Sequence, residues 1–177
     1  MKYLLIICIL FLGCTDNRLL DSDDFEVNPR FEVNAFQIQY PALLINVGNN
    51  SIPSPNTIRQ FVNADFLNEQ FNADYLKSIE FKFLAENSIN TPQTFEFTFF
   101  DADGLVTFRI IHSIASGNES SPETHRVANP YTTQSDIEKI TNSVELEVVF
   151  SQPLQASNNG IMNLECVIEA GYLYTGE

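Results

Sequence analysis

The sequence of 177 residues has no tryptophan, two histidines and three cysteines. A zinc site needs three or four ligands at workable spacing, and a Cys–His nucleophile needs two side chains within hydrogen-bonding reach. The histidines and cysteines of this sequence follow no such spacing. Glycine-rich phosphate loops, the Gly-x-Ser-x-Gly elbow and the HExxH motif are missing as well. We therefore predict no enzymatic activity and no cofactor.

Basic side chains are also scarce, since nine Lys and Arg stand against 23 Asp and Glu and give a formal net charge of −14. A surface of this sign repels phosphate backbones and anionic lipid headgroups, so we expect no nucleic acid partner. The simplest interpretation of the acidity is solubility. The alternative is a role in binding cations or basic partners.

The sequence has one long apolar run, residues 3–12, which is about half of the ~20 residues that a membrane-spanning helix needs. Lys2 precedes the run and Gly13 follows it. The segment thus has the basic start, apolar centre and small terminal residue of a secretion signal. We therefore predict that residues 1–13 are a cleaved signal peptide.

Cys14 stands directly after this segment, and the pair Gly13-Cys14 resembles the end of a bacterial lipoprotein signal. Phe11 stands where that family usually has leucine, and Leu12 where it usually has a small residue. With its Asn- and Phe-rich style, the chain resembles small Bacteroidota lipoproteins, a group that brings no known active site. The resemblance implies a diacylglyceryl group on the Cys14 thiol and usually a third chain on its amine. Such an anchor is effectively permanent, whereas one acyl chain binds a membrane only marginally.

The resemblance implies a place in the bacterial cell envelope, at the outer membrane. Some Bacteroidota lipoproteins carry an acidic cluster just after the cysteine, which resembles a surface-export signal. Here Asp16 stands alone at that place, and the denser acidic cluster begins several residues later. The sequence therefore leaves the periplasmic and the surface face open.

The organisation that we predict has three parts. Residues 14–29 are acidic and poor in strand-forming residues, which indicates a flexible tether after the signal peptide of residues 1–13. Residues 30–177 form one domain. Cys8 leaves with the signal and Cys14 would be acylated, so Cys166 has no cysteine with which to form an intramolecular disulfide.

Most of the predicted domain alternates apolar and polar residues, which is typical of strands with one buried face. The alternating stretches are residues 78–83, 95–99, 106–110, 144–148 and 162–168. The second and third of them flank the turn sequence Asp101-Ala102-Asp103-Gly104, which predicts a β-hairpin. Two sheets that face each other would bury both apolar sides. The predicted fold is an all-β antiparallel β-sandwich, immunoglobulin-like or related.

Short helical turns interrupt this pattern. A capping box that starts at Ser135 predicts a helix over residues 136–140, and residues 72–77 could form a similar turn. Both positions lead into an alternating strand, which suggests a weak internal repeat with a hairpin partner after each copy. Residues 57–70 mix the two periods and stay undecided.

Asp101 and Asp103 are weak candidates for a metal site, because two carboxylates two positions apart before a glycine resemble the opening of a calcium loop. The later ligands of an EF-hand are absent, and tight turns need Asp and Gly for reasons of their own. We favour the turn and predict no metal. Cys166 is expected to be a small buried hydrophobe. His112 is expected to point into the core, and His125 to be solvated in a loop.

Aromatic residues allow a ligand-binding interpretation. The fifteen phenylalanines could line an apolar pocket, but their spacing is better explained by the two inner sheet faces. Tyrosines near loops could stack on sugar rings, although tryptophan, the usual choice, is absent. These tyrosines are Tyr40, Tyr131, Tyr172 and Tyr174.

Two functions remain open. The leading hypothesis is a non-enzymatic, lipid-anchored accessory or adaptor protein that contacts a protein partner in the envelope and the membrane through Cys14. The alternative is a module that binds a glycan or calcium on the same tether. The identity of the ligand-binding residues is not predicted.

Overall fold

The computed structural model describes residues 26–47, 56–153 and 158–175. This part of the chain is mostly β-structure, as the alternating sequence predicts. The strands are β1 (Glu26–Val27), β2 (Arg30–Pro41), β3 (Asn56–Asn63), β4 (Leu76–Asn87), β5 (Gln93–Phe100), β6 (Val106–Ile114), β7 (Glu123–Tyr131), β8 (Glu145–Gln152), β9 (Ile161–Tyr172) and β10 (Tyr174–Thr175). The helical segments are α2 (Ala42–Val47), the 3-10 helix η2 (Asp65–Asn68), α3 (Gln70–Tyr75) and α4 (Gln134–Thr141).

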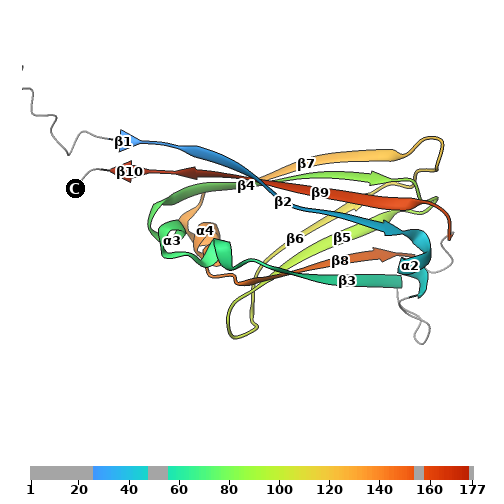
Figure 1. Cartoon of the computed structure of the whole chain (residues 1–177), viewed down its shortest axis with the longest axis horizontal. Coiled ribbons are helices and arrows are strands. Elements are labelled where there is room, and N and C mark those ends of the chain that lie inside the picture. Colours follow the sequence, from blue (N-terminus) through green and yellow to red (C-terminus); the bar gives the residue numbers. More distant parts are fainter. Residues whose placement is uncertain (1–25, 48–55, 154–157, 176–177) are drawn as a thin grey trace, which may run out of the picture. The chain divides into compact units, whose positions relative to one another are not determined.

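Eight strands form two four-stranded antiparallel sheets that pack face to face as a sandwich (Figure 1), which confirms the predicted fold class. The strand order is β2-β9-β4-β7 in one sheet and β3-β8-β5-β6 in the other. From β2 to β9, strands that follow each other in sequence lie in opposite sheets, except for the hairpin of β5 and β6. This interleaved order is that of a jelly roll rather than that of the immunoglobulin fold. The alternation of apolar and polar residues is a pattern within each strand, so it could not distinguish the strand order of a jelly roll from that of an immunoglobulin fold.

Residues Asn28–Leu173 form one compact unit that contains both sheets. The pair β1 and β10 belongs to a second unit, in which Glu26 pairs with Thr175 and Val27 with Tyr174. The last residues of the predicted tether therefore include a short paired strand. Cys14, the predicted signal peptide and the earlier part of the tether lie outside the described residues.

Phenylalanines from both sheets form the centre of the core. On β4 the side chains of Phe81 and Phe83 are buried, as the alternation predicts, and on β5 so are those of Phe95, Phe97 and Phe99. The rings of Phe83 and Phe97 stack across the two sheets with their centroids 4.5 Å apart. Burial of these large aromatic side chains, together with the aliphatic residues around them, drives the packing of the two sheets.

The last long strand and the hairpin follow their predicted patterns to different degrees. On β9 the predicted face is buried throughout, at Met162, Leu164, Cys166 and Ile168. On β6 the side chain of Ile110 is buried, but that of Val106 is exposed. A register shift at the end of β5 pairs Phe100 with Val106, where the alternation is interrupted.

The helical predictions were correct in place but not in their bounds. The cap of α4 is Thr133, not Ser135, and its Oγ1 accepts a hydrogen bond from the Asp136 N–H at 3.2 Å. The undecided stretch of residues 57–70 divides into β3, η2 and the start of α3. The prediction that a hairpin partner follows each copy of the internal repeat is wrong. Strand β5 lies in the other sheet from β4, and β9 lies in the other sheet from β8, so neither pair forms a hairpin.

Candidate functional site

The two sheets differ in length, and this difference creates the candidate site. Strands β2, β4 and β9 have 12 residues each, whereas β3, β5 and β8 have eight. Phe81 on β4 packs against Phe99, which is the next-to-last residue of β5, with ring centroids 5.5 Å apart. The first residues of β4 therefore continue past the end of β5. At about 3.3 Å per residue, four extra residues extend the longer sheet by roughly 13 Å.

The segment η2–α3 covers part of this overhang (Figure 1). Asn72 on α3 is buried and holds the cover in place. Its Nδ2 donates to the carbonyls of Phe66 at 2.6 Å and Leu67 at 3.3 Å. Its Oδ1 accepts a hydrogen bond of 2.8 Å from the Tyr172 hydroxyl on β9. One amide thus ties both helical turns to the longer sheet.

An apolar groove of about 290 Å³ stays open between the overhang and its cover. We call it the overhang groove. It is lined by Phe31, Val33, Phe66, Leu67, Glu69, Phe71, Asn72, Leu76, Ile79, Ile168, Ala170 and Tyr172. Several of the lining side chains are large, apolar and about half exposed, with 53% for Phe31, 47% for Phe66 and 42% for Phe71. A contiguous exposed patch of this kind in a concave place is typical of a binding site.

The polar groups of the overhang groove are largely committed to the fold. Both ends of the Asn72 amide and the Tyr172 hydroxyl take part in the hydrogen bonds described above. The rings do not form a flat platform, because Tyr172 meets Phe71 at 44° and Phe31 at 67°. Among the lining residues, Glu69 supplies the charged group. The overhang groove is therefore suited to apolar side chains more than to the hydroxyls of a sugar.

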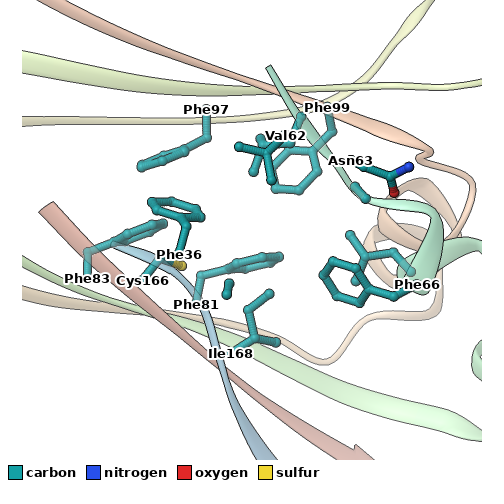
Figure 2. A pocket seen from close by; sticks show the side chains of 14 residues that line it. Phe36, Val62, Asn63, Phe66, Phe81, Phe83, Phe97, Phe99, Cys166 and Ile168 are labelled. Atoms are coloured by element: carbon teal, nitrogen blue, oxygen red, sulfur yellow. The ribbon is translucent and has the colours of Figure 1, made fainter. Parts of the chain in front are cut away.

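A second apolar space lies behind the overhang groove, between the two sheets (Figure 2). Figure 2 shows the rings of Phe36, Phe81, Phe83, Phe97 and Phe99 around it. Its volume is about 20 Å³, which could hold at most one water, and its walls offer almost no polar partner for one. These five phenylalanines are therefore packed as two inner sheet faces, as their spacing predicts, whereas Phe31, Phe66 and Phe71 line the overhang groove instead.

Three side chains form a common wall between this cavity and the overhang groove. Phe66, Leu67 and Ile168 line both spaces. Leu67 and Ile168 are buried, whereas Phe66 is half exposed and lies at the margin of the cavity in Figure 2. Packing of the core and the shape of the overhang groove are thus set by some of the same residues.

Asp101 closes the β5–β6 hairpin. Its Oδ1 accepts hydrogen bonds from the backbone N–H of Asp103 at 3.0 Å and of Leu105 at 2.8 Å. Gly104 takes the positive φ of 76° that the turn requires. In the described ranges, no three His, Cys, Asp or Glu side chains are grouped in a way that could hold a metal ion. The geometry supports the turn interpretation of these two aspartates.

The two histidines lie side by side, an arrangement that no sequence pattern predicted. His112 on β6 is half-buried between the rings of Phe83 and Phe95, and its Nε2 lies 3.0 Å from Nδ2 of Asn129 on β7. The His125 ring centroid lies 6.1 Å from that of His112, so the expectation of a solvated His125 was wrong in part. Burial lowers the pKa of His112, and the charge of His125 lowers it further, while the Asn129 contact acts in the opposite direction.

The other candidate residues have structural surroundings. Cys166 is buried, and burial raises the pKa of its thiol to about 12. Tyr40 packs on Phe150, and its hydroxyl donates to Gln60. The remaining candidates lie on strands rather than in loops: Tyr131 on β7, Tyr172 on β9 and Tyr174 on β10. Tyr172 alone of these four lines the overhang groove.

Charged side chains cover the outer face of the longer sheet. Lys82 on β4 lies 2.6 Å from a carboxylate oxygen of Glu169 and 3.4 Å from one of Glu32. Arg30 forms a second ion pair with Glu169 at 3.1 Å. The hydrogen bond with Lys82 lowers the pKa of Glu169, and the same bond raises the pKa of Lys82. This face is exposed to solvent, so the pairs contribute little to stability.

None of the helices in the described ranges has the length and apolar character needed to cross a membrane.

No protein-family model matches the sequence, and no curated protein matches it either. Solved structures with some similarity include a protein of Parabacteroides distasonis that is classed as secreted, at 9% identity and a TM-score of 0.47. The match covers 67% of this chain and 39% of that one. Dimeric latent PorU of Porphyromonas gingivalis has 13% identity and a TM-score of 0.37, over 85% of this chain and 13% of that one.

A third structure, Desmodium yellow mottle tymovirus, has 9% identity and a TM-score of 0.33, over 85% of this chain and 89% of that one. This chain thus spans well under half the length of the Parabacteroides and Porphyromonas proteins. Likenesses at this level carry no functional argument. The fold is defined by the strand order, and no family can be assigned to the chain.

Proposed function

We propose that this protein is a non-enzymatic binding module of the bacterial envelope, anchored through Cys14, which holds a protein partner by apolar side chains in the overhang groove. The observation that carries the proposal is the concentration of half-exposed aromatic rings in one concavity, among them Phe31, Phe66 and Phe71. Aromatic side chains dominate the energy of protein interfaces because each buries a large area at little entropic cost.

A protein partner suits the overhang groove better than a glycan. Sugar recognition needs free donors and acceptors beside a flat ring, whereas Asn72 and the Tyr172 hydroxyl are bonded within the fold and the rings are tilted. The volume of 290 Å³ lies at the lower end of small-molecule pockets, which span about 300–1,000 Å³. A few apolar side chains of another protein would fill such a space.

The anchor and the charge of the chain support a place at the membrane surface without direct contact to lipid headgroups. The sequence resembles a lipoprotein signal up to Cys14, and several acyl chains would hold the protein in place. A net charge of −14 disfavours electrostatic attraction to anionic lipids. A tethered adaptor keeps its binding surface free for a partner.

Co-purification from intact membranes, with the lipid anchor retained, tests the proposal. The informative variant is Phe31→Ser, and its matched control is Phe61→Ser on the edge strand β3. The two phenylalanines are 53% and 57% exposed, and only Phe31 lines the overhang groove. We expect the partner to be lost with Phe31→Ser and kept with Phe61→Ser. Truncation of an aromatic side chain in an interface weakens the free energy of binding by about 1–2 kcal/mol or more. Equal recovery with both variants would exclude the overhang groove as the binding surface.

The glycan or calcium module remains the alternative, and thermal unfolding separates it from the proposal. A ligand that binds the folded state raises the melting temperature by mass action. We expect no rise with calcium or with a panel of oligosaccharides. A rise with either ligand that is kept in Phe31→Ser would favour the alternative.

A further inference from the structure

Strand β2 has two halves with different surroundings. Its second half lies close to the other sheet, since the Tyr40 hydroxyl donates to Gln60 on β3 and the Phe36 ring lies 5.7 Å from that of Phe97. A bulge between Asn34 and Phe36 interrupts its register with β9. Residues 30–34 before the bulge lie over the overhang groove, where β3 has already ended.

The first half of β2 is a strand edge with one side unpaired among the described residues. Its other side pairs with β9, from Arg30 opposite Gly171 to Asn34 opposite Val167. Such an edge is a template for another extended chain, and proteins usually protect it with proline, a bulge or inward-pointing charge. In β2 the bulge and Pro41 come after this half, so the protection within residues 30–34 is limited to the charged side chains of Arg30 and Glu32.

The side chains of this half alternate between two environments. Phe31 and Val33 line the overhang groove, and Glu32 lies between them in sequence and faces the outer surface, where it meets Lys82. A strand added to this edge would continue the same alternation. Every second side chain of the added strand would enter the overhang groove, and the others would lie beside Glu32.

Charge indicates the chemistry of the outward-facing positions. The side chain of Glu32 is 61% exposed, and the nearby Lys82 is bonded more closely to Glu169, at 2.6 Å against 3.4 Å. The shallow concavity beside Glu32 is lined by Glu165 and also by the basic side chains of Lys82 and Arg126, so the attraction of a basic segment comes from the exposed Glu32 and from the net charge of the chain. With a net charge of −14, a second copy of this chain would be repelled, whereas a basic segment would be attracted.

We propose that the partner binds by strand addition: an extended segment with apolar residues at alternate positions and basic residues between them pairs with residues 30–34 of β2. Its apolar side chains fill the overhang groove and its basic side chains face Glu32. This inference rests on the proposed function and deepens it by naming the class of partner. Five residues of edge correspond to roughly 17 Å, so a partner segment of five to seven residues is sufficient.

The experiment uses the full chain with its anchor in detergent and a synthetic peptide of seven residues, Lys-Val-Lys-Phe-Lys-Val-Lys, measured by isothermal titration calorimetry. Two further peptides carry backbone N-methyl groups, one at the odd-numbered residues and one at the even-numbered residues. In an extended chain these two sets of N–H groups point to opposite edges. We expect one methylated peptide to bind like the parent and the other to bind at least tenfold more weakly.

Protein variants locate the binding. We expect Glu32→Lys to weaken the basic peptide at least threefold and to strengthen a peptide in which glutamate replaces each lysine. Phe31→Ser should weaken binding of the basic peptide to the wild-type protein and binding of the glutamate peptide to the Glu32→Lys protein. Phe61→Ser should change neither affinity. Because Glu32 and Phe31 are exposed, these variants should fold, and circular dichroism checks this.

The outcomes distinguish the inference from the function on which it rests. Equal binding of both methylated peptides, together with loss in Phe31→Ser, would overturn strand addition and leave the overhang groove as the site. No binding of the parent peptide at 1 mM would overturn the inference, while membrane co-purification would still test the function. A dimer in sedimentation velocity that Phe31→Ser dissociates would name a second copy as the occupant and would also overturn the inference.

Discussion

Replacement of Asn72 by alanine should release the cover of the overhang groove. The amide of Asn72 makes three hydrogen bonds, to the carbonyls of Phe66 and Leu67 and from the Tyr172 hydroxyl. At a net contribution of about 1 kcal/mol each, the three bonds stabilise the fold by roughly 3 kcal/mol. Alanine recovers about 0.6 kcal/mol through its higher helix propensity. We expect Asn72→Ala to lower the free energy of unfolding by about 2–3 kcal/mol.

Urea unfolding followed by circular dichroism measures this loss. With an m value of about 2 kcal/mol/M, the midpoint should fall by roughly 1 M. Gln70→Ala is the control on the same helix, because among the described residues its side chain bonds only to the exposed Asp74. The free energy of unfolding of this control should stay within about 0.5 kcal/mol of that of the wild type.

A double-mutant cycle isolates the bond between Asn72 and β9. Tyr172→Phe removes the hydroxyl that donates to Asn72 and should lower the free energy of unfolding by about 1 kcal/mol. If that bond ties the cover to the longer sheet, the effects of Asn72→Ala and Tyr172→Phe should not add, with a coupling of about 0.5–1 kcal/mol. A loss below 0.5 kcal/mol for Asn72→Ala, or strict additivity in the cycle, would refute this account of how the overhang groove keeps its shape.

Three further predictions concern the core, pH and the hairpin. Phe83→Ala should cost about 3–5 kcal/mol in urea unfolding, because it removes a buried ring stacked on the other sheet, whereas the exposed Phe61→Ala should stay within about 0.5 kcal/mol. The pKa of His112 is lowered in the fold, so the unfolded chain binds the proton more tightly. The stability that neutral His112 contributes should be fully present above the unfolded pKa of about 6.5 and should be lost as pH falls from there through the lower pKa of the folded state. His112→Gln should flatten the pH dependence of the melting temperature in that window, and an unchanged slope would contradict the argument. Asp101→Ala should lower the melting temperature equally with and without calcium, since it removes two turn hydrogen bonds; a difference between the two conditions would indicate a bound ion.

Patterns with a short period along the chain gave reliable predictions. The buried faces of β4, β5 and β9 follow from alternation alone, because side chains on a strand point to opposite sides. The Asp101 turn follows likewise, since its bonds reach only to Asp103 and Leu105. The bounds of α4 were less accurate, because Thr133 and Ser135 are both able to cap a helix and local sequence does not choose between them.

Arrangements that depend on strand order could not be predicted. The rings of His112 and His125 lie close together because β6 and β7 are edge strands of different sheets on the same side of the sandwich. The residues of neither strand indicate where that strand lies in its sheet. The overhang groove combines Phe31, Phe66 and Phe71 from three separate segments, one of which mixed helical and strand periods. A usable signal existed in the lengths of the strands: a stretch of 12 residues facing one of eight leaves apolar side chains without an opposite layer.

The wall shared by Phe66, Leu67 and Ile168 has a consequence for how occupancy can be detected. A partner that binds against these side chains also contacts residues that pack on the stacked rings between the sheets. Binding of the partner and stability of the folded protein are therefore coupled through the same side chains. Slower amide exchange at Phe97 and Phe99 on β5, which line the inner cavity but not the overhang groove, would report that coupling from within the interior.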